Sequence, residues 1–546
     1  MRRIQIYDTT LRDGCQGEEV ALTVDAKLAV AERLDAFGVH YIEGGWPGSN
    51  PRDVAFFGPA AKLGLRNARL VAFGMTRRPD LEAGKDPSLK ELLRAGTPVA
   101  CIVGKTWDLH VKTALRVSRE VNLQLISDTM AFLRRNLDEV IFDAEHFFDG
   151  WKANPGYALT CLEAAAAGGA TTICLCDTRG GSLPGEIEAG VRAARGATSV
   201  PLGIHCHNDG ELAVANSLAA VAAGCTQVQG TINGVGERCG NTNLTTLVPA
   251  LQLKSGYACV TAAQLAGLTE LSRFVDELAN REPHKQQAYV GQSAFAHKGG
   301  LHVSAVRRLA ETYEHIDPSL VGNHQRVLVS DQAGRSNLLS KAREFGFTDR
   351  EIEPCAKDLL RELKHLEHQG FQFESADASF ELLLLKAVKG EKLRHFRLLG
   401  FRVIDEKRSE GEDPIAEATI MVEGPDGSRE HTAAVGNGPI NALDGALRKA
   451  LLRFFPRIGE VRLVDYKVRV LEGEQGTGAV VRVLVESADA ADHWTTVGVS
   501  HNVIEASWQA LVDALDYKLY KDEKNRGRGA RGGAGRRAPA GKRKGR

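Results

Sequence analysis

The sequence predicts an α/β protein that begins with a closed (β/α)8 TIM barrel, and three observations support this class. Short apolar segments alternate with longer Ala-, Leu- and Glu-rich segments over residues 1–275. Strict alternation indicates a parallel sheet, and eight such units in about 250 residues are typical of a closed barrel. The first strand is followed by a charged turn, whereas a doubly wound sheet, the competing topology, usually has a Gly-rich turn there.

The predicted strands follow one another along the first half of the chain, and each precedes a helical segment such as TVDAKLAVAERLDAFG. They cover residues 4–8, 41–44, 69–73, 99–103, 139–143, 171–176, 202–206 and 227–231.

Three further regions follow the barrel. Residues 276–400 are predicted to form helical linker subdomains, because DREIEPCAKDLLRELKHLEHQG is apolar at i, i+3 and i+4. Strand-like blocks then recur between helices (FRVIDEK and EATIMVEG, later YKVRVLEG and AVVRVLVES), which predicts a duplicated α+β domain over residues 401–520. Residues 521–546 are expected to form a disordered basic tail rich in Gly, Ala and Arg.

Composition narrows the class of protein. The 546 residues have zero formal net charge, but the stretch from Lys524 to Arg546 holds ten of the 69 basic residues and no acidic one. The rest is mildly acidic, which argues against a nucleic-acid-binding body. Ten scattered cysteines without a CxxC pair suit a reducing compartment. No h-region follows Met-Arg-Arg and no run of about 18 apolar residues exists, so we expect a cytoplasmic protein without membrane contact.

Reactive side chains follow the predicted strands at their carboxyl ends. Arg12 and Asp13 come after the first strand, and the motifs IEGG, DAEH, CDTRG, HCHND and NGVGERCGNTN come at or after the second, fifth, sixth, seventh and eighth. The carboxyl ends of parallel strands meet on one face of a barrel, where active sites of this fold lie. The sequence therefore predicts one site built from several loops.

His205 and His207 are two residues apart on a strand, so their imidazoles point to the same side. An HxH pair alone is a weak signal, but Asp13 offers a carboxylate across the barrel mouth and Asn241 an amide oxygen. Such mixed ligation suits a catalytic Mn, Mg or Zn ion that also holds substrate. Asp13 could instead cap the helix expected at residues 23–37, although Thr23 and Asp25 are better placed to do so.

Four dispersed motifs, DTTLRDG, HCHND, GVGERCGN and AHKGGLH, together resemble those of the α-isopropylmalate synthase and homocitrate synthase family. Later stretches, AVGNGPINALDGALRKAL and HNVIEASWQALVDAL, resemble the C-terminal regulatory domain of that family. The residues CQGEEV after the first motif depart from the pattern of synthases that use branched 2-oxo acids. Together with HYIEGGWPGSNPRD and AHKGGLHVSAV, they are similar to the branch described as (R)-citramalate synthases.

The resemblance implies roles for individual residues. It implies a metal shell of Asp13, His205, His207 and Asn241. Arg12 would face the 2-oxo acid, Thr178 would contact its carboxylate and Glu145 would lie near the thioester methyl group. His302 and Tyr313 would form a catalytic pair, delivered to the active site by the linker region and from the partner subunit of a homodimer.

The implied reaction is the condensation of acetyl-CoA with pyruvate, leading towards isoleucine, with an amino-acid effector that is isoleucine or, second, leucine. A 2-isopropylmalate synthase, or a lyase or carboxyltransferase on the same barrel, is the alternative. Glu145 and the His302–Tyr313 pair both remain candidates for the base. Glu43 remains open between a structural ion pair and a substrate contact. Bulky Met75, Val103 and Phe142 at strand ends are the candidates that limit the acceptor's size.

Overall fold

A computed structural model describes the chain except residues 1, 329–333, 391–394, 472–475, 477 and 534–546. The chain divides into two compact units. The barrel unit comprises Met1–Ala296 and Glu314–Arg326, and the C-terminal unit comprises His297–Tyr313 and Val327–Arg546. Each unit is described by itself below.

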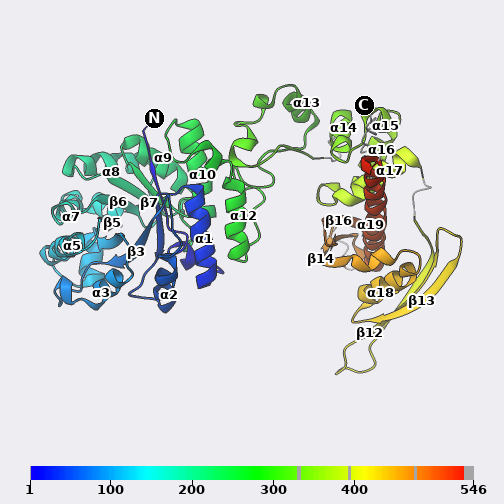
Figure 1. The fold of residues 1–546 in the computed structure, drawn as a ribbon, viewed down its shortest axis with the longest axis horizontal. Coiled ribbons are helices and arrows are strands. Elements are labelled where there is room, and N and C mark those ends of the chain that lie inside the picture. The colour runs from blue at the N-terminus through cyan, green and yellow to red at the C-terminus, as the bar shows by residue number, and fades with distance from the viewer. Residues whose placement is uncertain (1, 329–333, 391–394, 472–475, 477, 534–546) are drawn as a thin grey trace, which may run out of the picture. The chain divides into compact units, whose positions relative to one another are not determined.

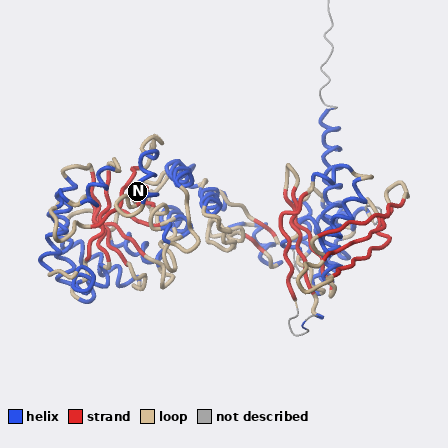
Figure 2. Tube along the Cα trace, turned by 90° about the horizontal axis from the view of Figure 1, so that it is seen from below, coloured by secondary structure: helices blue, strands red, loops and turns tan. Residues whose placement is uncertain are grey.

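The barrel unit contains the predicted closed parallel barrel of eight strands, in which β1 pairs with both β2 and β8. Figures 1 and 2 show the strands of this unit gathered at its centre with helices around them. Its strands are β1 Gln5–Asp8, β2 Tyr41–Gly45, β3 Arg69–Met75, β4 Val99–Lys105, β5 Glu139–Glu145, β6 Thr172–Asp177, β7 Leu202–Cys206 and β8 Gln227–Gly230. Strands β3, β4 and β5 extend two residues beyond the predicted carboxyl ends, because pairing continues to Met75↔Val103 and Lys105↔Glu145. These added residues reach the mouth of the barrel.

Helices cover the outside of the barrel, and the main hydrophobic core lies between them and the strands. The longer helices are α1 Val24–Phe37, α2 Pro51–Ala60, α3 Pro87–Arg94, α5 Arg119–Arg134, α6 Phe147–Ala153, α7 Pro155–Ala167, α8 Pro184–Ala197, α9 Ala213–Ala223, α10 Leu244–Pro249 and α12 Leu268–Leu278. A second, smaller core fills the barrel interior with aromatic and aliphatic side chains: Tyr7, Tyr41, Val71, Phe73, Val99, Cys101 and Ile141.

The cap of α1 settles the role of one acidic residue. Thr23 accepts a hydrogen bond from the backbone N–H of Ala26, as expected of an N-cap, and Gly38 ends the helix with φ of 93°. Asp13 precedes a short 3-10 turn, Gly14–Gln16, and its side chain makes no capping bond there. Its carboxylate is therefore available at the barrel mouth.

The C-terminal unit begins with helices and continues with two similar sheet-and-helix blocks (Figure 1). The helices are α13 Gly300–Arg308, α14 Arg335–Glu344, α15 Asp349–Ile352, α16 Ala356–His368 and α17 Asp377–Lys389. The blocks are the antiparallel sheet β11 Arg397–Glu406, β12 Ile415–Glu423, β13 Arg429–Gly436 with α18 Pro439–Leu452, and the sheet β14 Arg462–Val470, β15 Val481–Ala488, β16 His493–Ser500 with α19 Val503–Gly533. The predicted duplication is present.

Two boundaries differ from those the sequence suggests. Residues beyond 275 stay with the barrel unit up to Ala296, because Tyr289, Val290 and Phe295 are buried in its core. The helix α19 continues to Gly533, so residues 521–533 are helical where a disordered tail is predicted; residues 534–546 of that tail lie outside the described residues. Within the described part of the chain, no helix combines the length and apolar character needed to cross a membrane.

Candidate metal and substrate site

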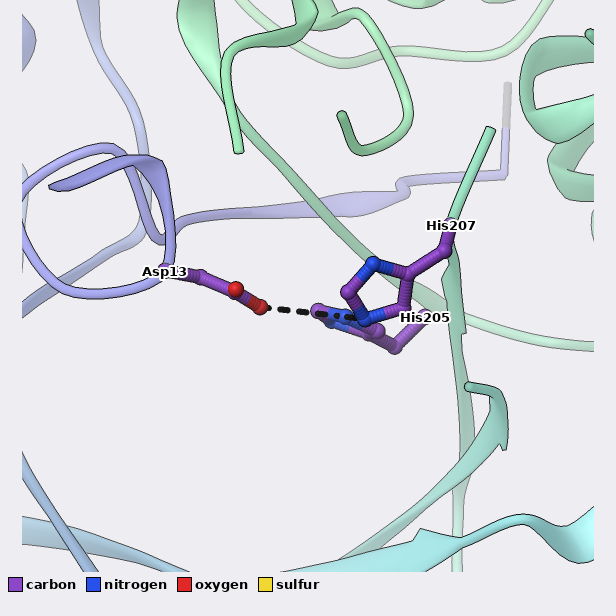
Figure 3. Close-up of side chains that lie close together, drawn as sticks. All are labelled: Asp13, His205 and His207. Carbon is purple, nitrogen blue, oxygen red and sulfur yellow. Dashed lines mark hydrogen bonds and ion pairs between the residues drawn. The ribbon is translucent and has the colours of Figure 1, made fainter. Parts of the chain in front are cut away.

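Asp13, His205 and His207 meet at the mouth of the barrel (Figure 3). Asp13 lies in the turn after β1, His205 belongs to β7 and His207 follows it directly. The Nε2 atom of His205 lies 3.3 Å from Oδ2 of Asp13 and 3.4 Å from Nε2 of His207. All three side chains are buried, and their ligand atoms lie within 4.8 Å of one another.

Burial and neighbouring charges give Asp13 and His207 the protonation states that metal binding requires. Burial raises the pKa of Asp13, but the charge of Arg12 and the contact with His205 outweigh it and hold that pKa well below its usual range. Burial, together with the neighbouring His205, lowers the pKa of His207 to about 3. Asp13 is therefore ionised and His207 neutral near pH 7, as metal ligands must be.

His205 behaves differently. Burial lowers the pKa of its imidazole, but the hydrogen bond and charge of Asp13 raise it more, and the net shift is upward.

The spacing and chemistry of the donors fit a divalent metal ion. Bonds of about 2.1 Å at right angles place neighbouring ligand atoms about 3 Å apart, close to the separations observed here. The fourth predicted ligand, Asn241, pairs through its backbone with His207 and donates from Nδ2 to the carbonyl oxygen of Val235. Its Oδ1 is buried and has no hydrogen-bond partner in the described part of the chain.

Arg12 is held by Glu43, a residue for which the sequence leaves two roles open. Glu43 at β2 is fully buried and accepts hydrogen bonds from Arg12 Nε at 2.6 Å, Tyr7 Oη at 2.6 Å and Thr9 Oγ1 at 2.5 Å. The Arg12 guanidinium also lies 3.8 Å from the centre of the Phe73 ring. Burial lowers the pKa of Arg12, but the charges of Glu43 and Asp13 raise it well above its usual value. Glu43 is thus an ion-pair partner that positions Arg12.

Thr178 and Glu145 lie at the carboxyl ends of neighbouring strands: Thr178 follows β6 and Glu145 ends β5. The hydroxyl oxygen of Thr178 accepts a hydrogen bond from the backbone N–H of His146 at 2.9 Å, so its own hydrogen remains free to donate to a ligand. Glu145, the last residue of β5, forms an ion pair with Lys105, the last residue of β4. Lys105 is a site residue that the sequence does not single out, because only the extended pairing of β4 and β5 brings it to Glu145.

A cavity of about 290 Å³ joins these groups. Its lining includes Arg12, Asp13, Glu145, Thr178, His205 and His207, which are the predicted barrel residues other than Asn241.

Apolar side chains complete the wall of this cavity. Met75 and Val103 line it as expected, together with Trp46 and Phe73. The third candidate, Phe142, is not part of this wall: it is fully buried in the core outside the barrel, because alternation along β5 turns Asp143 inward and Phe142 outward.

His302 and Tyr313 belong to the C-terminal unit. Their rings are stacked, with centroids 4.2 Å apart and planes 27° from parallel. Both side chains are exposed within the chain, and Tyr313 is 48% exposed. The structure thus pairs these two residues with each other, and their role at the barrel site stays a prediction.

Comparison with known proteins assigns the family. A family model described as HMGL-like matches residues 3–275, a homocitrate synthase post-HMGL domain-like model matches 289–370, and a LeuA allosteric (dimerisation) domain model matches 374–519. The (R)-citramalate synthase of Geobacter sulfurreducens is 56% identical over 96% of this chain and 99% of its own length. That of Aquifex aeolicus is 53% identical over 95% and 98%.

A 2-isopropylmalate synthase of Methanocaldococcus jannaschii matches equally fully, over 96% of both chains, but is only 30% identical. The two (R)-citramalate synthases are thus more similar to this chain than this 2-isopropylmalate synthase is. With its barrel, its linker region and its allosteric domain all matched, the chain belongs to the (R)-citramalate synthase family.

Proposed function

We propose that this chain condenses acetyl-CoA with pyruvate and hydrolyses the resulting thioester, giving (R)-citramalate and CoA on the route towards isoleucine. The observation that carries the proposal is the single cavity shared by Asp13, His205, His207, Arg12 and Thr178. It combines a metal-binding set with a fixed cation and a hydroxyl donor. The identity of 56% and 53% with two (R)-citramalate synthases, over nearly the whole chain, supports pyruvate as the acceptor.

The 2-oxo acid would be bound through its carboxylate and keto oxygens. A divalent ion (Mn, Mg or Zn) held by Asp13, His205, His207 and Asn241 would polarise the keto group. Thr178 would donate its free hydroxyl hydrogen to the carboxylate. Arg12 uses Nε for Glu43 and Nη1 for Asp13, so its remaining terminal nitrogen has no protein partner among the described residues. That nitrogen would stabilise the alkoxide that develops at C2.

The donor methyl group must lose a proton before its carbon attacks the keto carbon. Glu145 is one candidate base, and its ion pair with Lys105 keeps the carboxylate close to the cavity. The stacked His302–Tyr313 pair is the other, acting from the partner subunit of a homodimer. The enolate carbon then bonds to C2, and water cleaves the thioester with CoA as the leaving group. This last step makes the condensation irreversible.

Acceptor size is set by the apolar wall. Met75, Val103, Trp46 and Phe73 stand around the polar groups that would hold the keto acid. A methyl substituent on the acceptor needs less space than an isopropyl group, and each methylene is worth about 1–3 kcal/mol in such discrimination. Pyruvate is therefore the proposed acceptor, with 2-oxoisovalerate the alternative.

The allosteric-domain match over residues 374–519 favours regulation by an amino acid. We propose isoleucine as the effector, with leucine second, bound by the duplicated sheet-and-helix blocks of a homodimer. Neither a nucleic acid nor a membrane is a proposed partner.

Thiol release from acetyl-CoA with pyruvate, 2-oxobutyrate, 2-oxoisovalerate and 2-oxoglutarate at equal concentrations tests the proposal. We expect the highest rate with pyruvate. A clear preference for 2-oxoisovalerate would instead identify a 2-isopropylmalate synthase, and no release with any acceptor would refute the condensation.

Two variants test which side chains set acceptor size. Met75→Ala should raise kcat/KM for 2-oxobutyrate relative to pyruvate, because it widens the cavity. Phe142→Leu changes bulk on the outer face of the barrel wall and should leave that ratio unchanged.

A further inference from the structure

A hydrogen-bonded path of three buried side chains leads from the barrel interior to the metal-binding cluster. Nε2 of Gln229 lies 3.0 Å from Oδ1 of Asp143, and Oε1 of Gln229 lies 3.0 Å from Nδ1 of His205. All three residues are at most 5% exposed. Gln229 on β8 therefore lies directly behind the imidazole whose other nitrogen faces Asp13.

The neighbours of Asp143 decide which way the Gln229 amide points. An ionised carboxylate only accepts hydrogen bonds, and Oδ1 of Asp143 lies within hydrogen-bond distance of the Gln229 amide. The amide NH2 of Gln229 must therefore face Asp143, which turns the amide oxygen towards His205. An amide oxygen can only accept, so Nδ1 of His205 carries a hydrogen. Nε2 is then the nitrogen that faces Asp13 and His207, and it can bind an ion once its own hydrogen has left.

The two histidines of the cluster differ in this respect. Nδ1 of His207 is buried and has no hydrogen-bond partner in the part of the chain that the structure describes. Among the described residues, then, only His205 has its ring oriented from behind. Metal-binding histidines usually have such a partner on the second nitrogen, and loss of that partner typically weakens metal affinity 10–100-fold.

We propose that Gln229 is a positioning residue of the metal centre: it accepts a hydrogen bond from Nδ1 of His205 and so holds Nε2 ready to bind the ion, while Asp143 fixes the orientation of the Gln229 amide. This inference rests on the metal centre proposed above. It gives a role in metal binding to two buried polar residues outside the proposed ligand set, of which Asp143 also lines the cavity.

Binding of Mn²⁺ to the full-length chain without substrates, measured by equilibrium dialysis, tests the proposal. Gln229→Met keeps the side-chain volume but removes the acceptor, and we expect 10–100-fold weaker binding. Gln229→Glu keeps an acceptor for Nδ1, because the new carboxylate and Asp143 can share one proton, and should bind Mn²⁺ within a few-fold of the unaltered chain. A role in packing alone would be served at least as well by Met as by Glu.

Gln227 provides a matched control on the same strand. It is two residues before Gln229, so its side chain points to the same face of β8, and it is fully buried. Neither polar atom of its side chain has a hydrogen-bond partner within the described ranges. Gln227→Met should therefore leave Mn²⁺ binding unchanged.

Each outcome is decisive. Mn²⁺ binding by Gln229→Met at the affinity of the unaltered chain would overturn the proposal, and so would equal losses in the Met and Glu variants. If the unaltered chain binds no Mn²⁺, the metal centre itself fails, and the role of Gln229 with it. Urea unfolding checks that each variant folds. If Gln229→Met does not, Gln229→Asn takes its place, since its oxygen stops about 1.5 Å short of Nδ1 and should give the same loss.

Discussion

Replacing Glu43 by Gln should slow the reaction without greatly changing the affinity for acetyl-CoA. Glu43 is fully buried and accepts three hydrogen bonds, one of them from the charged Arg12. Gln has one acceptor oxygen and no charge. It can serve Thr9 and Arg12 on one side, but its NH2 group then faces the Tyr7 hydroxyl, and Arg12 keeps only Asp13, at 3.4 Å, as a counter-charge.

The expected effects of Glu43→Gln on the free energy of unfolding and on kcat can both be estimated. Breaking a buried ion pair by removing one partner typically costs about 3–5 kcal/mol, and since Gln keeps one acceptor we expect a loss near the lower end, about 3 kcal/mol. Removing one preorganised donor to a developing oxyanion typically costs about 10²–10³ in kcat. Arg12 would be displaced rather than deleted, so we expect about a 10²-fold fall in kcat.

A similar group at the opposite rim of the barrel offers a control. Glu139, at the start of β5, accepts a hydrogen bond from Tyr41 Oη at 2.9 Å and forms an ion pair with Arg69. It repeats the Tyr–Glu–Arg arrangement, but its side chain is 26% exposed. Glu139→Gln should therefore cost at most about 1 kcal/mol and leave kcat unchanged.

Steady-state thiol release and urea unfolding measure both variants. An unaltered kcat in Glu43→Gln would refute the role of Glu43 in holding Arg12. An equal fall of kcat in Glu139→Gln would show that the effect follows barrel stability rather than the position of Arg12.

Four further outcomes are expected. Chelation should abolish thiol release and Mn or Mg should restore it; full rate after thorough chelation would contradict a metal at Asp13. Mixing an inactive Asp13→Asn chain with an inactive His302→Ala chain should recover part of the activity, and verified heterodimers without activity would place both groups in one subunit. Isoleucine should inhibit thiol release more than leucine does, an order that inhibition curves check directly. Burial raises the pKa of Asp8 to about 7 despite hydrogen bonds from Thr10. The folded state therefore binds more protons than the unfolded state between about pH 4 and 7, and this group lowers stability as pH rises through that window. Asp8→Asn should remove this component, so urea unfolding at pH 4 and 8 should differ less in the variant; an unchanged difference would contradict the shift.

The order of strands and helices could be predicted from the sequence because each element carries its own local pattern. Eight apolar segments separated by helical ones indicate a parallel barrel, and the carboxyl ends of its strands must meet on one face. Asp13, His205 and His207 could be brought together on that basis alone, since their convergence follows from topology. The two sheet-and-helix blocks of the C-terminal unit were predictable for the same local reason.

Only the tertiary structure decided which side chains of the strands point into the barrel and which point outward. Barrel strands are buried on both faces and read as continuous apolar runs, so polarity does not mark which residues point inward. For this reason Phe142 could not be told from Asp143 by pattern, and Lys105 became a site residue only when β4 and β5 paired beyond their predicted ends.

Contacts between distant parts of the chain also depended on closure of the barrel. Glu43 reaches Arg12 across 31 positions and Gln229 reaches Asp143 across 86. A single sequence carries no local signal of such a pair, because each partner is an ordinary polar residue until the strands close and exclude water. Only then does burial make an unpaired charge or amide costly, which favours these two pairs.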